Sequence, residues 1–579
     1  MSKIFSKISP LYTSLHSYNK EKFKRDLWAG LTVGTILIPQ GMAYAVLAGV
    51  PPQYGLYTAL IPLVIYALFA SSTKLSVGPV AISALLVLAG VSEVAPIGSD
   101  QYISLVILTG FLVGFLQLLI GSLKLGFIAN FISHPVIAGF TSAAAIIIIV
   151  SQLGDVLGIS IPRMEKIHQS CFYVCGHLKE TNLLNFGICL SSIAIIIILK
   201  KITRAIPGAL IVVILGILLS YFFQLEQYGI KIIKDIPKGL PIFLLPELTY
   251  ENFRALLPTV LTVTVIGIVE CLGIAKSMQS KHKDHILSPD TELMALGYSK
   301  IAGSFFQAIP SSGSFSRSAV NSSMNAQTGI ASLITAAIIA VTLLFLTSLF
   351  YFLPYAVLAA IILLAVFNLF DYKEAIHLWK THKIDFMMMI TTFVITLLIG
   401  IEEGIFSGVL LSIISVLYKS SKPNIIEIAN IRGSSHYRNV DRFDDLDKFP
   451  NTLILRFDNQ LYFGNADYFK DSILEEISTS NSEIKYVILD ASQMHDIDST
   501  GIHILGDLDL DLMKRNIELH ICDANGVVRD MLYKSGLMSE KDRHHMTVHN
   551  AITEIHFHNP SSDEDVINAM QTNIKNQNS

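Results

Sequence analysis

Charged residues are scarce in this chain, and the scarcity is uneven. Only 15% of the 579 residues are Asp, Glu, Lys or Arg, whereas soluble globular chains carry about 25%. The deficit is concentrated in roughly the first 420 residues, where apolar runs of about 18 or more residues recur. Such runs are candidates for transmembrane helices, so the composition predicts a polytopic membrane protein rather than a soluble one.

Zinc-type cysteine spacings and catalytic constellations are also missing. Of the five cysteines, Cys171 and Cys175 lie together in one loop; a disulfide between them stays open, and an unpaired state is favoured. Without a nucleophile–base pair or a metal-ligand pattern on one element, we expect no enzyme, no metal, no cofactor and no nucleic-acid partner. We expect the following histidines to face solvent: His282, His285, His544, His545, His549, His556 and His558.

The N-terminal residues lack the pattern of a cleavable signal peptide, because no small-residue cleavage site follows a short apolar run. Residues 1–26 are polar and become basic just before the first apolar run. We therefore predict a cytoplasmic N-terminal segment over 1–26. Its basic residues beside the first span are Lys20, Lys22, Lys24 and Arg25.

Hydrophobic runs predict about fourteen spans over residues 27–420, in two groups of about seven. The groups correspond to repeats over about 27–223 and 256–418. An even number of spans puts both ends of the chain on one side, and basic loops indicate the cytoplasm. The predicted spans are 27–46, 53–70, 77–91, 103–120, 134–153, 182–199, 205–223, 256–275, 290–309, 313–327, 329–347, 350–368, 384–400 and 403–418.

The third span of each group is short and begins at a helix-breaking stretch, residues 76–79 in the first group and 310–313 in the second. Paired, short, Gly/Pro-interrupted segments at matching positions indicate an inverted repeat with a binding site between half-helices. The two half-helix N-termini are then expected to face each other near the midplane. Unpaired N–H groups and the positive end of the helix dipole make such a place an anion site.

Arg317 lies in the polar stretch Ile309–Gly329, at the first turn of the second half-helix. An arginine at membrane depth costs about 2.5–3.5 kcal/mol on insertion scales. A re-entrant loop that merely packs is the alternative, but this cost favours an anion-binding role.

Glu270 is the only carboxylate that we place well inside a span of the second repeat. Desolvation favours its neutral form, which suits proton coupling; an ion pair with Arg317 is an equally open alternative. Gln40 and Tyr44 lie one turn apart on the first span and share a face. They are candidates to line the cavity, although interhelical hydrogen bonds would also explain them.

After Lys422-Pro423 the composition becomes polar, and short strands alternate with amphipathic helices. This pattern predicts a small α/β domain over 430–558, followed by a disordered tail over 559–579. The strands expected are 452–457, 460–463, 486–489 and 517–521, and the helices are 466–477, 500–513 and 527–535.

Several motifs resemble those of the SulP anion permeases with a carboxy-terminal STAS domain. The transporter motifs are Pro39-Gln40-Gly41-Met42-Ala43-Tyr44-Ala45, Val50-Pro51-Pro52-Gln53-Tyr54-Gly55-Leu56-Tyr57, Ser76-Val77-Gly78-Pro79 and Gly313-Ser314-Phe315-Ser316-Arg317-Ser318-Ala319-Val320-Asn321. The STAS motifs are Leu489-Asp490 and Ile497-Asp498-Ser499-Thr500-Gly501. The resemblance covers nearly the whole chain. It implies a seven-plus-seven inverted repeat with core and gate domains, anion transport and a homodimer.

Carried over by motif position, the resemblance implies roles for single residues. Glu270 occupies the family's acidic position, but Ile274 stands where sodium-coupled members have a hydroxyl residue, so proton coupling is favoured over sodium coupling. Ser499 matches a serine that is phosphorylated in some STAS relatives; the alternative, that Asp498 and Ser499 cap a helix, is favoured. The implied substrate-binding residues are Gln40, Tyr44, Val80, Ala81, Phe315, Ser316 and Arg317.

The sequence thus predicts a proton-coupled importer of sulfate or a similar oxyanion, working by an elevator-type alternating-access motion in a bacterial inner membrane. The bacterial assignment rests on the compact STAS domain, which lacks a long insertion. A bicarbonate, chloride or C4-dicarboxylate carrier, or a channel-like or regulatory anion protein, remains the alternative. Further expected partners are membrane lipid and a cytoplasmic protein that binds the STAS domain.

Overall fold

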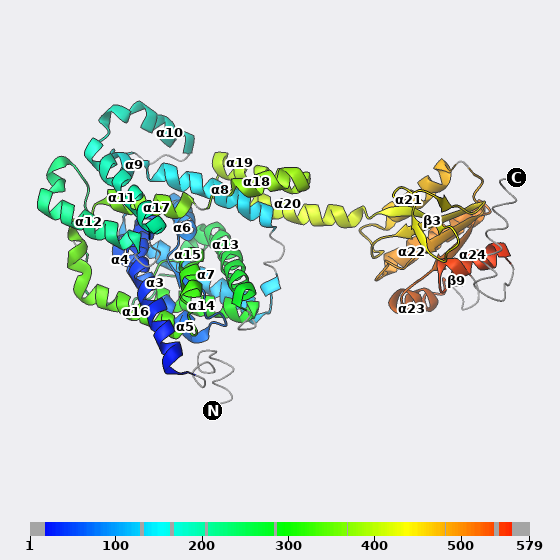
Figure 1. Ribbon diagram of the computed structural model, residues 1–579, viewed down its shortest axis with the longest axis horizontal. Coiled ribbons are helices and arrows are strands. Elements are labelled where there is room, and N and C mark those ends of the chain that lie inside the picture. Colours follow the sequence, from blue (N-terminus) through cyan, green and yellow to red (C-terminus); the bar gives the residue numbers. More distant parts are fainter. Residues whose placement is uncertain are drawn as a thin grey trace. The chain divides into compact units, whose positions relative to one another are not determined.

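The computed structural model describes residues 18–127, 133–161, 167–202, 207–234, 236–282, 287–367, 369–480, 482–537 and 543–557 (Figure 1). The chain forms two compact units, Met1–Ser412 and Ile413–Ser579. The predicted tail over 559–579 and three of the histidines, His282, His285 and His558, lie outside the described side chains.

The first unit is helical, and a helix occupies each of the predicted spans. Nine helices within the described ranges are long and apolar enough to cross a membrane, and two shorter apolar helices, Ala81–Val94 and Gly208–Phe223, occupy two further spans. The helices Pro289–Ser304, Phe315–Ser323 and Lys383–Leu398 occupy the other three. The fold is therefore that of a polytopic membrane protein, roughly as the fourteen-span prediction requires. The helices of the first group are α3 (Lys20–Leu47), α4 (Pro52–Thr58), α5 (Ile61–Phe69), α6 (Ala81–Val94), α7 (Asp100–Ser122), α8 (His134–Ser151), α11 (Leu183–Ile202) and α12 (Gly208–Phe223).

The second group repeats this pattern, with polar caps marking the helix starts. Ser288 accepts a hydrogen bond from the backbone of Thr291 before Pro289 begins α14, and Ser314 does the same for α15. The helices of this group are α13 (Tyr250–His282), α14 (Pro289–Ser304), α15 (Phe315–Ser323), α16 (Ile330–Val341), α17 (Tyr355–Phe367), α19 (Lys383–Leu398) and α20 (Ile401–Ser421).

Short elements lie between the long helices or, like η4 and η5, continue one of them. Cys171 and Cys175 lie on one of the short elements, α10, and both thiols are free. These elements are α9 (Leu153–Leu157), α10 (Ile167–Gly176), η2 (Leu178–Glu180), η3 (Leu225–Tyr228), η4 (Thr342–Leu346), η5 (Thr347–Phe352) and α18 (Tyr372–Thr381).

Two helix bundles can be distinguished in the first unit from the contacts between elements. In one bundle α14 packs on α5 and α7, α16 on α3, and α13 on α6 and α7. In the other α19 packs on α8 and α17 on α8, α11 and α12. Glycines permit the closest approaches: a Cβ on Gly55 of α4 would lie 1.9 Å from the carbonyl oxygen of Gly41 on α3. Gly41 belongs to the motif that contains Gln40, and Gly55 belongs to the motif that follows it in the chain.

A two-stranded sheet joins the third spans of the two repeats. Strand β1 (Ser76–Gly78) pairs antiparallel with β2 (Ser312–Ser314), so that Val77 lies opposite Gly313. Each strand leads directly into a helix that starts inside the bundle, β1 into α6 and β2 into α15. The helix-breaking residues therefore become a shared ribbon from which the two half-helices leave.

The second unit is an α/β domain. Its sheet has the strand order β4-β3-β6-β7-β8-β9, with β5 paired to β3; β6 to β9 run parallel. Separate apolar clusters cover the two faces, one beneath α21, α22 and α23 and one beneath α24. The elements are β3 (Ile425–Ile431), β4 (Tyr437–Asn439), β5 (Leu446–Asp447), β6 (Thr452–Phe457), α21 (Ala466–Thr479), β7 (Tyr486–Asp490), α22 (Ser499–Lys514), β8 (Glu518–Cys522), α23 (Gly526–Lys534), β9 (His544–His545) and α24 (Val548–Phe557).

Two expectations for this domain are wrong. The strand predicted over 460–463 is only an isolated bridge between Leu461 and Ile497, because the chain turns at once towards α21. His545 and His549 do not face solvent: both side chains are buried, His545 on β9 and His549 on α24. The amphipathic helix α24 packs on one face of the sheet against β7, β8 and β9, and both histidines lie in this contact, which local polarity does not reveal.

Candidate functional site

The site is organised by the ribbon β1–β2 and the two helix starts beside it. Helix α6 begins at Ala81 after Val80, and α15 begins at Phe315 after Ser314. The first backbone N–H groups of both helices have no partner within their own helix, as at any helix start. Because α6 and α15 start next to the same ribbon, two positive helix ends come together deep in the bundle.

Arg317 lies in the first turn of α15 with none of its side chain exposed (0%). Its Nε donates to Ser76 Oγ (3.4 Å), and its Nη1 donates to the carbonyl oxygen of Pro79 (3.2 Å) and to Gln40 Oε1 (3.4 Å). Its Nη2 is buried and has no hydrogen-bond partner in the described part of the chain. The guanidinium is therefore held by three neutral oxygens and keeps one unused donor.

Gly78 of β1 packs closely against this donor. A Cβ on Gly78 would lie 3.3 Å from Arg317 Nη2, tighter than an ordinary contact. A side chain at this point of β1 would therefore crowd the guanidinium.

Glu270 of α13 is joined to β2 rather than to Arg317. Ser312 Oγ donates to Glu270 Oε2 at 2.8 Å, and the backbone N–H of Gly313 lies 3.0 Å from Cys271 Sγ. Glu270 and Arg317 interact through space, but no ion pair joins the two described side chains. The arrangement argues against a simple structural ion pair between Glu270 and Arg317.

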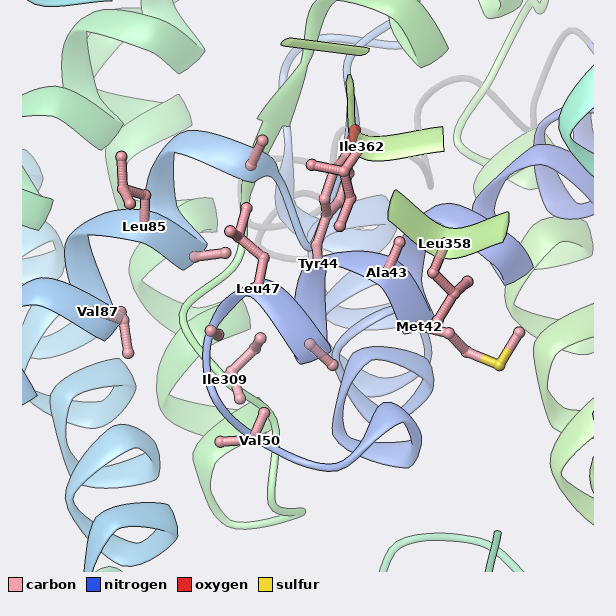
Figure 2. Packing of buried hydrophobic residues seen from close by; sticks show 14 of the residues in the cluster. Met42, Ala43, Tyr44, Leu47, Val50, Leu85, Val87, Ile309, Leu358 and Ile362 are labelled. Atoms are coloured by element: carbon pink, nitrogen blue, oxygen red, sulfur yellow. The ribbon is translucent and has the colours of Figure 1, made fainter. Parts of the chain in front are cut away.

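The other residues predicted for the site gather around Arg317. Gln40 contacts it directly, and Tyr44, one turn further along α3, interacts with it through space. Figure 2 shows Tyr44 within the buried apolar cluster that also holds Leu47. Val80 and Ala81 are buried at the start of α6.

Phe315 and Ser316 differ from these residues because both are exposed at the start of α15. Phe315 is 55% exposed although it lies beside a fully buried arginine. Ser316 Oγ lies 3.2 Å from Ser314 Oγ, the oxygen that caps the helix. The start of α15 thus presents an aromatic ring and hydroxyl groups on its open side.

Sequence reasoning missed two members of this neighbourhood, Ser312 and Lys300. Ser312 bonds Glu270, although the hydroxyl-rich run does not single it out. Lys300 of α14 is buried near Glu270 and donates to Gln117. Lys300 could have been found from the sequence, because it is a charged residue inside a predicted span, as Arg317 is.

A second buried carboxylate of the second repeat lies in the first turn of a helix rather than well inside a span. Glu292 of α14 is 1% exposed. It accepts hydrogen bonds from Tyr66 Oη and Ser71 Oγ, both at 2.6 Å. These donors come from α5 and the segment that leads to β1, so Glu292 ties α14 to the approach of the ribbon.

In the second unit, Asp498 caps α22. Its Oδ1 accepts from the backbone N–H of Gly501 (2.7 Å), and its Oδ2 accepts from the backbone of Phe463 (3.0 Å). Ser499, the first residue of the helix, is exposed. The geometry agrees with a capping role for Asp498 and leaves the Ser499 hydroxyl accessible.

The fold and the buried cationic site define a membrane permease, and comparison with known proteins identifies its family. The sulfate permease family matches residues 23–392, and the STAS domain matches residues 445–551. The chain therefore belongs to the sulfate permease family and carries a STAS domain.

Named relatives are similar over almost the full chain. Sulfate transporter 4.1, chloroplastic, of Arabidopsis thaliana is 37% identical over 563 residues, which cover 94% of this chain and 82% of the relative. High affinity sulfate transporter 2 of Stylosanthes hamata is 30% identical, with 94% and 86% covered.

Solved structures share the fold. SLC26A9 superposes with a TM-score of 0.88 at 23% identity, covering 96% of this chain and 93% of that one. The transmembrane domain of the cyanobacterial bicarbonate transporter BicA gives a TM-score of 0.59 at 21% identity, covering 68% and 98%.

Proposed function

We propose that this protein is a secondary active transporter that takes up sulfate together with protons. The observation that carries the proposal is the buried, unpartnered Nη2 of Arg317 beside two helix starts. A buried donor on a charged group is costly when unsatisfied, so its partner is best sought in a bound anion. The relatives named as sulfate transporters support sulfate as that anion.

The proposed substrate site combines charge with backbone donors. Arg317 supplies the charge, and the starts of α6 and α15 supply unpaired N–H groups. The open side of α15 supplies Phe315 and Ser316, whereas Tyr44 closes the site from α3. The substrate-binding residues proposed are Gln40, Tyr44, Val80, Ala81, Phe315, Ser316 and Arg317.

Glu270 is proposed as the proton carrier. When it is ionised, its charge competes with the anion for Arg317; when it is protonated, that competition disappears. Proton and anion binding then favour each other, which is reciprocal linkage. Ile274, one turn further along α13, is buried and offers no oxygen, which supports protons over sodium as the coupling ion.

An elevator-type motion is proposed for alternating access. The ribbon, α3, α13 and α15 are bonded to one another through Arg317, Glu270 and their partners. The site can therefore travel as one body against the bundle of α8, α11, α12, α17 and α19.

A bicarbonate, chloride or C4-dicarboxylate carrier, or a channel-like or regulatory anion protein, remains the second candidate. One feature of the site favours this candidate, because backbone N–H groups and one arginine bind any small anion. The bicarbonate transporter BicA, which shares the fold at low identity, is consistent with it.

The proposal includes a bacterial inner membrane, cytoplasmic N- and C-termini, surrounding lipid and a homodimer. A cytoplasmic protein that binds the STAS domain, and phosphorylation of the exposed Ser499, belong to the proposal as well.

Uptake into proteoliposomes containing the purified protein tests the function. Labelled sulfate, bicarbonate, fumarate and chloride are offered separately, with and without an inward proton gradient. The proposal expects sulfate accumulation that the gradient accelerates. Uptake of another anion with no sulfate uptake would favour the second candidate.

A further inference from the structure

Lys300 is a buried cation, and no ion pair joins it to a carboxylate of the described residues. Its side chain is 3% exposed in the middle of α14. Within the described residues, the one hydrogen bond of its ammonium group is to Gln117 Oε1 on α7, at 2.8 Å. An amide oxygen does not neutralise a positive charge, so the compensating charge for Lys300 has to lie further away.

Close helix packing fixes where Lys300 lies. A Cβ on Gly114 of α7 would be 2.7 Å from Lys300 Cβ, so α7 and α14 touch at this level. Gln117 Nε2 has no hydrogen-bond partner in the described part of the chain and lies 3.2 Å from where a Cβ on Gly267 would be. Gly267 is one turn before Glu270 on α13. The pair Lys300–Gln117 therefore lies against the turn that carries Glu270.

Two carboxylates are near enough to consider as counter-charges. Glu292 lies two turns earlier on α14, about 12 Å along the helix, and is occupied by Tyr66 and Ser71. Glu270 interacts with Lys300 through space and also with Arg317. Glu270 is thus flanked by two buried cations that reach it from different elements.

We propose that Lys300 supplies the second positive charge of the anion site and makes the site prefer dianions to monovalent anions. This inference rests on the proposed function, in which Arg317 binds the anion and Glu270 carries the proton. With Glu270 protonated, Arg317 and Lys300 leave two positive charges, which match a dianion such as sulfate. With Glu270 ionised, one positive charge remains and the dianion is released more easily.

Lys300 acts at a distance and is a positioning residue for charge, since within the described residues its ammonium group donates to Gln117 and not to a residue of the ribbon. Loss of one positive charge weakens the attraction for a dianion twice as much as that for a monovalent anion. A merely structural lysine would change the affinity for both anions by a similar factor. The ratio of the two affinities is therefore the diagnostic quantity.

The test uses full-length protein in proteoliposomes and competition against labelled sulfate uptake. Unlabelled sulfate and nitrate serve as the dianion and the monovalent anion. Lys300→Met removes the charge, and Lys300→Gln also removes it but keeps a donor for Gln117. The matched control is Ser299→Ala on the same helix, because the Ser299 hydroxyl is buried and, among the described residues, donates to the carbonyl oxygen of Leu296 in its own helix.

The expected result is a fall of at least about ten-fold, equivalent to about 1.4 kcal/mol, in the sulfate-to-nitrate affinity ratio of both lysine variants. Ser299→Ala should keep the ratio. The inference is overturned if Lys300→Met and Lys300→Gln fold and keep the sulfate-to-nitrate affinity ratio of the unmodified protein. It is also overturned if neither of these variants folds whereas Lys300→Arg does. If the unmodified protein transports neither anion, or Arg317→Ala retains its anion affinity, the proposed function itself fails.

Discussion

Arg317 is fully buried, and no carboxylate of the described residues forms an ion pair with it; the two together are unusual for a side chain that stays charged. Its contacts to Ser76, Pro79 and Gln40 fix the direction of the guanidinium but do not neutralise it. The proposed function assigns the compensating charge to the transported ion.

Replacing Arg317 by alanine should therefore remove most anion affinity. Charge-assisted hydrogen bonds contribute about 1.5–3 kcal/mol, so the dissociation constant for sulfate should rise at least about ten-fold. Calorimetric titration of the purified variant measures this directly, with size-exclusion chromatography to check that the proposed dimer stays folded. Ser323→Ala, at the exposed far end of α15, is the control. Unchanged affinity in Arg317→Ala would give the arginine a structural role only.

Glu270→Gln should separate anion binding from proton coupling. Glutamine mimics the protonated carboxyl, and its amide can still pair with Ser312 Oγ. The variant should bind and exchange anion but lose acceleration by an inward pH gradient. Uptake into proteoliposomes with and without the gradient, in both proteins, measures the difference. If the variant still accumulates substrate in response to the gradient, another residue carries the proton.

The same assay checks the choice of ion for the unmodified protein. A sodium gradient that drives uptake, with no response to pH, would contradict the reasoning from Ile274.

The two central charges of the candidate site were predictable from sequence, whereas their contacts were not. Arg317 and Glu270 stand out because a charge inside an apolar run is expensive. Lys300 met the same criterion and was overlooked. The role of Ser312 could not be predicted, because neighbouring hydroxyl residues differ only in which way the backbone turns them.

At the scale of elements, helix-breaking residues predicted where α6 and α15 begin, but not what lies between them. Pro79 and Gly313 indicate interrupted helices. The antiparallel pairing of Val77 with Gly313 is invisible locally, because it depends on how the two repeats meet. The ribbon is nevertheless what joins the two helix starts at one site.

The buried histidines of the second unit are an element-scale case in which polarity misled the prediction. His520 on β8 lies 3.0 Å from His545 on β9, measured from Nδ1 to Nε2, and His545 Nδ1 lies 3.3 Å from Glu554 of α24. Burial, with the nearby His545 and Arg543, lowers the pKa of His520 from 6.5 to about 4. Burial also lowers the pKa of His545, although Glu554 opposes this.

Acid should therefore destabilise the STAS domain. The unfolded chain binds a proton at the ordinary histidine pKa, whereas folded His520 does so only near 4. The stability that neutral His520 contributes is complete above pH 6.5 and is lost as pH falls from about 6.5 towards 4. Thermal unfolding of a 423–579 fragment, which has its own two apolar clusters, should show a falling midpoint over this range.

His520→Gln provides the comparison for this experiment. The unfolding midpoint of the variant should depend less steeply on pH, because the variant lacks the imidazole of His520, which takes up a proton when the domain unfolds. Some slope should remain, since burial also lowers the pKa of His544 and His556. A midpoint independent of pH, or equal slopes in both proteins, would contradict the linkage.

For the whole molecule, periodicity and composition predicted the class of fold well. Apolar runs delimited the spans because a bilayer requires about 20 apolar residues per helix, and the return of polar residues after Lys422 marked the second unit. Element boundaries in that unit were less accurate, since β3 begins at Ile425, before the domain start placed at 430. Pro423 marks the end of the helix, but the apolar residues of β3 follow it after Asn424 alone, so the strand adds no further signal at its start.

Removing the STAS domain should lower transport without altering selectivity. All the residues assigned to the anion site lie before Lys422, and both apolar clusters of the STAS domain are built from residues after it. Deletion of 436–579 should therefore reduce uptake or surface expression, yet sulfate, bicarbonate, fumarate and chloride should compete in the same order as in the full chain. Competition assays in proteoliposomes, normalised to the amount of reconstituted protein, measure that order.

The position of the cut provides the control. Deletion of 436–579 leaves β3 in place without β6, its main partner in the sheet, and an unpaired strand promotes aggregation. A second deletion starting at Pro423 removes β3 as well and should express better for that reason. If either truncated protein is transport-competent but ranks the anions differently, the STAS domain contributes to the selectivity of the site, and assigning selectivity to the ribbon and half-helices alone is wrong.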